Sequence, residues 1–253
     1  MLQCFHADLH VHTCLSPCAD IIMSPLRIVQ RSKKLKLDII GICDHNSAEN
    51  AAATIRAAEH SSVTVLPGME IASAEEVHVL ALFEKTDDVL AMQGFVYQHL
   101  PNTSNDPHLF GEQVIANEFD DFLGFHERML MTATDIPLHT LVQKVHKYNG
   151  IAIASHADRP SFGLYGQLGF VPPDLELDAM ELSPHISYEQ AIIQFPDMIQ
   201  FPVISSSDAH HLDDIGKNEI QLWLAEPTFS EIQKALKKED GRKIEEQKRA
   251  HED

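Results

Sequence analysis

The sequence predicts an α/β barrel whose functional site lies at the C-terminal ends of the strands, and three observations support this. Strand-like and helix-like segments alternate along the chain. Several strand segments are almost continuously apolar, as expected for parallel strands covered on both faces. Imidazole and carboxylate side chains recur where these segments end. In a barrel such strand ends meet at one mouth.

In chain order, the predicted strands are the apolar runs at about residues 4–11, 37–43, 62–67, 77–83, 150–155, 178–182 and 201–206. Helices are predicted between them at about residues 25–35, 47–60 and 137–149. Ser24-Pro25 is an N-cap followed by proline at the first helical position, and Ser47 caps an alanine-rich segment. The third helix ends at Asn149-Gly150. This alternation favours a mainly parallel sheet.

Two segments depart from the repeat. Residues 84–136 are too long for one crossover helix and contain a turn-rich stretch at 101–107, so we predict a helical insertion there. It either covers the site and helps to select the substrate or decorates the periphery. We assign residues 1–227 to the barrel with this insertion, and residues 228–253 to a charged C-terminal helix and tail.

Composition limits the partners. Of 253 residues 44% are hydrophobic, and no apolar run approaches the roughly 20 residues that cross a bilayer, so no membrane partner is predicted. The formal charge of −19 argues against binding to long nucleic acid, but not against a small phosphorylated substrate such as a nucleotide or short oligonucleotide. Four cysteines, all before residue 44, and an N-terminus without a signal-peptide pattern predict a cytoplasmic protein.

A metal centre is predicted from the spacing of the candidate ligands. His10 and His12 are two residues apart at the end of a predicted strand, so both point from the same face. Asp208 and His210 repeat this spacing after a late apolar run. Further imidazole and carboxylate groups at strand ends are those of His45, Glu70 and His156.

Together these segments resemble a known family. The motifs, in order, are Asp8-Leu-His-Val-His-Thr13, Asp44-His45-Asn46, Pro67-Gly-Met-Glu-Ile71, Val77-His-Val-Leu80, Ser155-His156 and Ser207-Asp-Ala-His210. Over roughly residues 5–225 the chain resembles the polymerase and histidinol phosphatase (PHP) domain family, in its stand-alone, metal-dependent phosphoesterase form. The resemblance implies a distorted (β/α)7 TIM-like barrel that holds two or three divalent metal ions at the C-terminal mouth.

The resemblance also implies a set of metal ligands. The first ion would use His10, His12, Asp208 and a bridging Glu70; the second Glu70, His45 and Asp20; the third His78, His156 and His210. Mixed imidazole and carboxylate ligands suit zinc, manganese or iron.

Two of these positions are unusual. Asp20 comes later after the histidine pair than the family pattern places its carboxylate, and the thiol of Cys14 or Cys18 is an alternative ligand. His78 precedes its apolar run, so either this strand is short or irregular or the chain turns back sharply after Glu70.

Four further residues near the predicted site are candidates for supporting roles. Arg159 is the best candidate for a phosphate clamp, with a salt bridge to Asp158 or elsewhere as the alternative. Asp8 either accepts an N–H from a ligand imidazole or binds backbone groups, and Phe162 and Tyr165 are candidates to stack on a base.

The predicted function is hydrolysis of a phosphate ester of a small, nucleotide-like substrate by a metal-activated hydroxide. Arg159 would assist, and His156 or His210 would protonate the leaving oxygen if the third metal position is empty. One alternative is a C–N bond metallohydrolase of the amidohydrolase type, which usually bridges its metals through a lysine, and no lysine ends a core strand here. The other is a non-catalytic metal-binding module.

Overall fold

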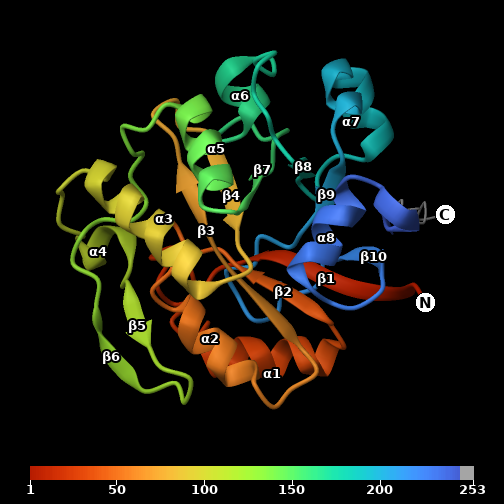
Figure 1. Ribbon diagram of the computed structural model, residues 1–253. Helices are drawn as coiled ribbons and strands as arrows, with labels where there is room; N and C mark the ends of the chain where they lie inside the picture. The colour runs from red at the N-terminus through yellow and green to blue at the C-terminus, as the bar shows by residue number, and fades with distance from the viewer. Residues whose placement is uncertain (246–253) are drawn as a thin grey trace.

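The computed structural model describes residues 1–245 and contains one large, strongly curved sheet (Figure 1). The strand order is β11-β10-β1-β2-β3-β4-β7-β8-β9. The strands are β1 (Gln3–Val11), β2 (Ile39–Ile42), β3 (Thr64–Ala72), β4 (His78–Leu82), β7 (Ile151–Ala154), β8 (Ala179–Leu182), β9 (Val203–Ser205), β10 (Ile220–Leu224) and β11 (Lys243–Ile244).

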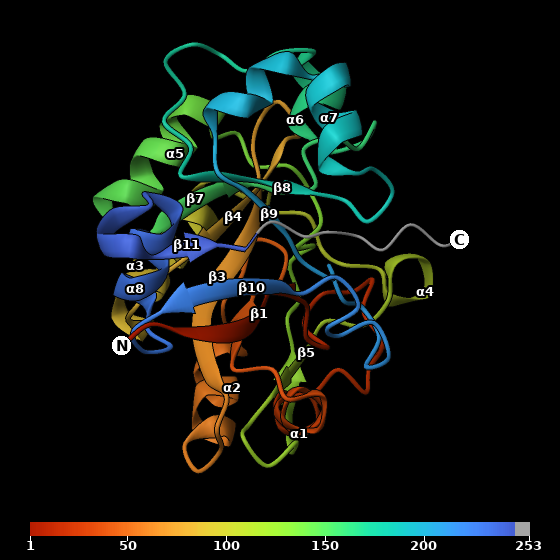
Figure 2. The ribbon, with the colours of Figure 1, turned by 90° about the vertical axis from the view of Figure 1, so that its right-hand side faces the viewer.

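The sheet is a nearly closed barrel. Val11 of β1 forms a parallel bridge with Ala209, just after β9, so the first and the last barrel strands meet at the mouth. The barrel strands β1, β2, β3, β4, β7, β8 and β9 coincide with the apolar runs predicted from the sequence, which confirms the predicted fold class. β10 extends the sheet beyond β1, with which it pairs in antiparallel fashion (Figure 2).

Helices surround the sheet (Figure 1). They are α1 (Pro25–Leu35), α2 (Ala51–Ala58), α5 (Leu138–Lys147), α6 (Leu164–Leu168), α7 (Tyr188–Gln194) and α8 (Phe229–Leu236), with 3-10 turns at Pro196–Gln200 and Glu239–Gly241. α2 begins later than the predicted residue 47. Asn50, not Ser47, occupies the N-cap position of this helix, and the Ser47 hydroxyl lies 2.8 Å from the Tyr97 hydroxyl.

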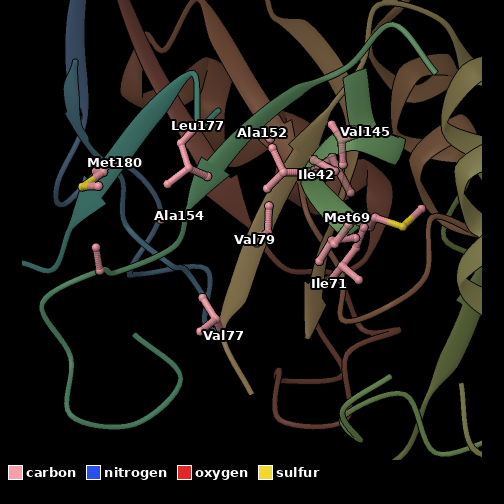
Figure 3. Close-up of a cluster of buried hydrophobic side chains, with 14 of the residues drawn as sticks. Ile42, Met69, Ile71, Val77, Val79, Val145, Ala152, Ala154, Leu177 and Met180 are labelled. Carbon is pink, nitrogen blue, oxygen red and sulfur yellow. The ribbon is translucent and has the colours of Figure 1, made fainter. Parts of the chain in front are cut away.

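Apolar side chains fill both sides of the barrel wall. Figure 3 shows Met69 and Ile71 of β3 and Val79 of β4 packed near Val145 of α5. A second cluster of buried side chains, which includes Leu9 of β1, occupies the other face. Coverage of both faces explains why these strands are almost continuously apolar in the sequence.

β4 is antiparallel to both of its neighbours, β3 and β7. Ala72, at the end of β3, pairs with His78, at the start of β4. The chain therefore turns back sharply after Glu70, as one of the two sequence interpretations required. This reversal brings the first residue of β4 to the same mouth as the last residues of the parallel strands.

The insertion contains two helices and, in addition, a two-stranded hairpin that the sequence interpretation missed. Its elements are α3 (Thr86–His99), α4 (Pro107–Phe110), β5 (Val114–Ala116) and β6 (Phe122–Phe125). It packs on the loop that follows β1: the Val114 N–H donates to the Cys14 carbonyl at 2.8 Å. The Asn50 side chain joins both segments by donating to Val114 and to Thr13. The insertion therefore forms one wall beside the mouth.

Gly111 of the insertion lies close to the loop that follows β1. Its φ is +98°, and a Cβ there would lie 2.0 Å from the Pro17 carbonyl oxygen. We expect Gly111→Ala to lower the free energy of unfolding by about 1–3 kcal/mol, measured by urea denaturation. Gly94→Ala in α3 is the control, since a Cβ there meets nothing within 4 Å and is expected to stabilise the helix slightly. Equal effects of the two substitutions would contradict the close approach.

The predicted C-terminal helix is α8, and β11 after it pairs with β10. The end of the predicted tail, residues 246–253, lies outside the described residues. Across residues 1–245, every helix is too short or too polar to span a membrane.

Candidate metal centre

The carboxylate of Glu70 lies at the centre of a ring of imidazoles. Its Oε1 is 3.0 Å from His78 Nδ1 and 3.1 Å from His156 Nε2. Its Oε2 is 3.0 Å from His45 Nδ1. Glu70 stands near the end of β3 and is almost fully buried. This carboxylate is therefore placed to share cations with several imidazoles, as the predicted bridging role requires.

Asp208 faces the histidine pair of β1. Its Oδ1 lies 3.3 Å from the Nε2 atoms of both His10 and His12. Its Oδ2 accepts a hydrogen bond from Arg159 at 2.7 Å. The pairing register of β1 with β2 shifts between Asp8 and Val11, an irregularity of the kind that re-aims side chains near a site.

The backbone is strained at two of these positions. Asp208 has a φ of 51° and His156 a φ of 31°, values that residues other than glycine rarely adopt. Such strain persists only where surrounding contacts impose it, and it clusters at functional sites.

The structure divides the family-implied third set of ligands. His78 and His156 face each other with ring centroids 5.5 Å apart. His210 instead stacks on His12 at 4.2 Å and lies 6.2 Å from His45. His210 therefore lies beside His12 and near His45 rather than in the pair formed by His78 and His156.

The structure does not bring Asp20 into the cluster. Its Oδ2 lies 3.7 Å from His211 Nδ1, and its Oδ1 accepts the Ile22 N–H at 3.2 Å. Cys18 lies beside the cluster instead of Asp20, with its Sγ 3.2 Å from His45 Nε2. Cys14 is buried against Val114 of the insertion, and burial raises the pKa of its thiol to about 12.

Glu181 supports the centre and was missed in the sequence. Both its carboxylate oxygens lie 3.2 Å from His10 Nδ1, and Oε1 accepts the backbone N–H of His156 at 3.1 Å. Its carboxylate orients the His10 ring so that Nε2 faces Asp208. The available signal was Glu181 itself, a carboxylate between apolar residues near the end of the predicted strand at 178–182.

Two further acids hold the mouth loops. His12 Nδ1 lies 2.9 Å from the Ser16 hydroxyl, which donates to Asp44 at 2.7 Å. Asp44 therefore supports His12 through Ser16. Asp8 accepts hydrogen bonds from Ser207 and from the Gly216 N–H, so of its two interpretations the structure shows the binding of backbone groups.

The two candidate stacking residues differ. Phe162 is partly exposed and stacks on His78 with ring centroids 4.6 Å apart. Tyr165 is buried against Phe195, and its hydroxyl donates to Asp197, so it is not available to a substrate.

The charges of the centre are strongly perturbed. Burial favours the neutral acid, but the imidazoles of His78 and His10 hold the pKa of Glu70 well below its ordinary value. The pKa of His10 is raised by Glu181, Asp208 and Glu70 against the effect of burial. Burial and the nearby His210 lower the pKa of His12. The pKa values of the adjacent imidazoles of His10 and His12 thus move in opposite directions, because carboxylates surround the first and other imidazoles the second.

The donor set fits divalent metal ions. Three groups have ligand atoms within 4.8 Å of one another: His12, His45 and His210; His10, His12 and Asp208; and His45, Glu70 and His78. The buried Nδ1 atoms of His78 and His156 make no hydrogen bond, although His78 Nδ1 lies 3.0 Å from Glu70. Buried imidazole nitrogens without a hydrogen bond are what metal ligands without their ion would show.

Comparison with known proteins agrees with this geometry. The PHP domain matches residues 8–160 of the chain. The chain belongs to the PHP domain family. Members of this family bind divalent metals, and the fold is that of a PHP-type metal-dependent phosphoesterase.

Several proteins resemble the chain over nearly its whole length. The uncharacterised protein YqxK of Bacillus subtilis is 23% identical over 271 residues, covering 94% of this chain and 63% of that protein. The lesion-specific endonuclease Q of Pyrococcus furiosus has a TM-score of 0.76 at 18% identity, with 96% of this chain and 58% of that chain covered. An endonuclease Q bound to a 27-mer duplex with an abasic lesion has a TM-score of 0.78 at 19% identity, with the same coverage.

A two-domain protein from Bacteroides vulgatus, predicted to contain a PHP-like metal-dependent phosphoesterase, has a TM-score of 0.56 at 15% identity. The match covers 96% of this chain and 64% of that chain. The chain thus spans less than two thirds of the length of these relatives.

We expect Glu181→Gln to weaken metal binding about 10- to 100-fold, because the His10 ring loses its charged partner. Competition with a chromophoric chelator measures this change. The matched control is Glu112→Gln, an exposed acid of the insertion. A change in affinity of less than twofold would mean that Glu181 serves only the packing of β8.

Proposed function

We propose that the protein hydrolyses a phosphate ester of a small, nucleotide-like substrate with the help of divalent metal ions. The observation that carries the proposal is the buried Glu70 carboxylate, within 3.1 Å of His45, His78 and His156. A single carboxylate among several imidazoles is an arrangement that bridges two adjacent cations.

Two or three ions of zinc, manganese or iron would be held here. Glu70 would bridge, and the further ligands of the family pattern that lie around it are His10, His12, His45, His78, His156, Asp208 and His210. When bound, such ions lower the pKa of a water molecule and neutralise phosphoryl oxygens.

Arg159 is the group we assign to the substrate phosphate. Its guanidinium is held by Asp208 at 2.7 Å but remains partly exposed, so its other N–H groups are available at the mouth. The same residue lines a cleft of about 500 Å³, together with Asp158, Pro160, Ser183, His185, Ile186, Gln190 and Gln194. Amide, imidazole and aliphatic groups in this cleft suit a heteroaromatic substituent such as a nucleobase.

Protonation of the leaving oxygen falls to His156 or His210. His210 lies at the rim, and its Nδ1 is 2.8 Å from the Asp208 carbonyl oxygen, which leaves Nε2 for the substrate. His156 is buried, with Nε2 against Glu70. His210 is the more accessible acid if no metal ion occupies it.

A second candidate is cleavage of phosphodiesters in DNA. It is favoured by the structural similarity to endonuclease Q, one structure of which contains a duplex with an abasic lesion. The net charge of −19 opposes it, because a long polyanion would be repelled. The C–N hydrolase and the non-catalytic module have less support, since in the described chain a glutamate rather than a lysine occupies the bridging position.

The test is turnover by protein reconstituted separately with Mn, Zn, Fe and Mg. The substrates are p-nitrophenyl phosphate, bis-p-nitrophenyl phosphate, nucleoside mono- and bisphosphates, short 5′-phosphorylated RNA, and duplex DNA with and without an abasic site. Metal-dependent hydrolysis of the small esters is expected. Cleavage of the duplex alone would favour the second candidate, and bound metal without hydrolysis of any ester would refute both.

Arg159→Lys should lower kcat/KM for nucleotides about 10- to 100-fold, because lysine keeps the charge but loses the bidentate contact. Steady-state kinetics measure the effect, with Arg56→Lys as the control since Arg56 pairs with Glu118 in the insertion. An unchanged kcat/KM would remove Arg159 from the phosphate site.

A further inference from the structure

We propose that Cys18, His45 and His210 form a thiolate-containing metal position at the outer rim of the centre, selective for zinc-like ions over manganese and magnesium. This rests on the presence of the proposed metal centre but not on which ester the protein hydrolyses. It replaces Asp20, the carboxylate that the family pattern implies, with a sulfur ligand.

The two ring nitrogens of His45 contact two different candidate ligands. Nδ1 lies 3.0 Å from Glu70, and Nε2 lies 3.2 Å from the Cys18 sulfur. The contact with the buried carboxylate fixes the ring, so Nε2 points toward the thiol.

His210 completes the group. Its Nδ1 is held 2.8 Å from the Asp208 carbonyl oxygen, so Nε2 remains available as a ligand atom. The ligand atoms of His45 and His210 lie within 4.8 Å of each other, together with that of His12. One sulfur and two or three imidazoles match the donors and the number that zinc prefers.

Backbone hydrogen bonds of the loop that follows β1 hold Cys18 near His210. The Asp20 N–H donates to the carbonyl of His210 at 2.9 Å, and the Ala19 N–H donates to Ser16 at 2.9 Å. The residues that follow Cys18 are thus bound to the backbone of its proposed partner. This bond also turns the Asp20 side chain toward His211 and away from the centre.

The other cysteine of this loop shows what a structural thiol looks like. Cys14 is buried and packs with Val114 and Ala116. Cys18 is exposed at the mouth and therefore accessible to an incoming ion.

The chemistry follows from the donor. On binding, the thiol proton leaves to solvent and the sulfur donates an electron pair to the ion, with no change of oxidation state. A thiolate ligand favours zinc, iron(II) or cobalt(II) over the harder manganese(II) and magnesium. His210 is then a ligand rather than an acid, so protonation of the leaving oxygen falls to His156.

Cobalt(II) reconstitution of the full chain tests this without any substrate. The wild-type protein should show a near-ultraviolet thiolate-to-cobalt charge-transfer band. Cys18→Ser should lose the band and about one bound ion per chain, while Cys4→Ser, which alters an exposed thiol at the start of β1, should keep both. The proposal would be overturned if the band persisted in Cys18→Ser. It would also be overturned if the wild type showed no band and bound as many ions as Cys18→Ser.

Cys18→Asp covers the case in which the serine variant does not fold. The carboxylate should restore the ion count without the charge-transfer band and shift the preference of this position toward manganese. Identical metal preference in wild type and Cys18→Asp would also overturn the proposal. Failure of the phosphoesterase proposal would leave both readouts unchanged, so the two failures are distinguishable.

Discussion

Replacement of Glu70 by glutamine is expected to reduce phosphoesterase turnover by more than about 100-fold while the fold is kept. Loss of a supporting partner already costs 10- to 100-fold in such sites, and Glu70 is the group that His45, His78 and His156 share. Glutamine has the same shape but no charge, so it cannot bridge two cations. Initial rates at saturating metal, with circular dichroism for the fold, measure both effects.

Glu112→Gln again serves as the control, because this exposed residue of the insertion should tolerate the change. A Glu70→Gln protein that keeps full turnover would refute the metal centre assigned here. A protein that loses turnover but keeps its full complement of ions would show that Glu70 acts on the substrate instead of the metals.

Removal of the metal ions is expected to abolish activity and to lower the stability of the protein. At a free metal concentration 1,000 times the Kd, one bound ion stabilises the folded state by about 4 kcal/mol. Chemical denaturation before and after treatment with a chelator measures this difference. Readdition of the metal should restore both properties; full stability and activity after verified removal of the metal would exclude the proposed cofactor.

The pH dependence of metal binding has a definite sign. Burial would lower the pKa of His45, but Cys18 and Glu70 raise it to about 10 in the metal-free protein. An incoming ion must displace this proton, so metal affinity should rise by up to about tenfold per pH unit below pH 10. In the metal-free protein, the stability that protonated His45 contributes is complete below its unfolded pKa and lost as the pH rises through about 10. Calorimetry in buffers of different ionisation enthalpy counts the protons released, and zero would contradict this assignment.

The barrel could be predicted because its strands are buried on both faces. This burial leaves a long apolar signature, as in residues 37–43, where β2 lies within the predicted run. The hairpin β5–β6 was missed because three of the four residues of β6 are exposed and its pattern is not that of a core strand. The periodicity of apolar residues indicates which side chains are buried, and few side chains of β6 are buried.

The candidate site was predictable where candidate ligands follow strands, and unpredictable where contacts between distant segments position a side chain. The positions of His10, His12 and Asp208 follow from a two-residue spacing at strand ends. The support that Glu181 gives to His10 links residues 171 apart in the chain, and no local pattern encodes it. Likewise, the choice between Asp20 and Cys18 depends on a backbone bond from Asp20 to His210.

The position of β1 within the sheet has a consequence for how the protein folds. β1 pairs with β10, where Gln3 is opposite Leu224, and its end bridges to Ala209. His10 and Asp208 come from the two ends of the barrel sequence, and contacts between distant parts of the chain require a costly loop closure, so we expect this pair to form late in folding. During synthesis β1 is made long before β10, a strand with which it pairs. We therefore expect the ions to enter an already formed barrel rather than to nucleate it.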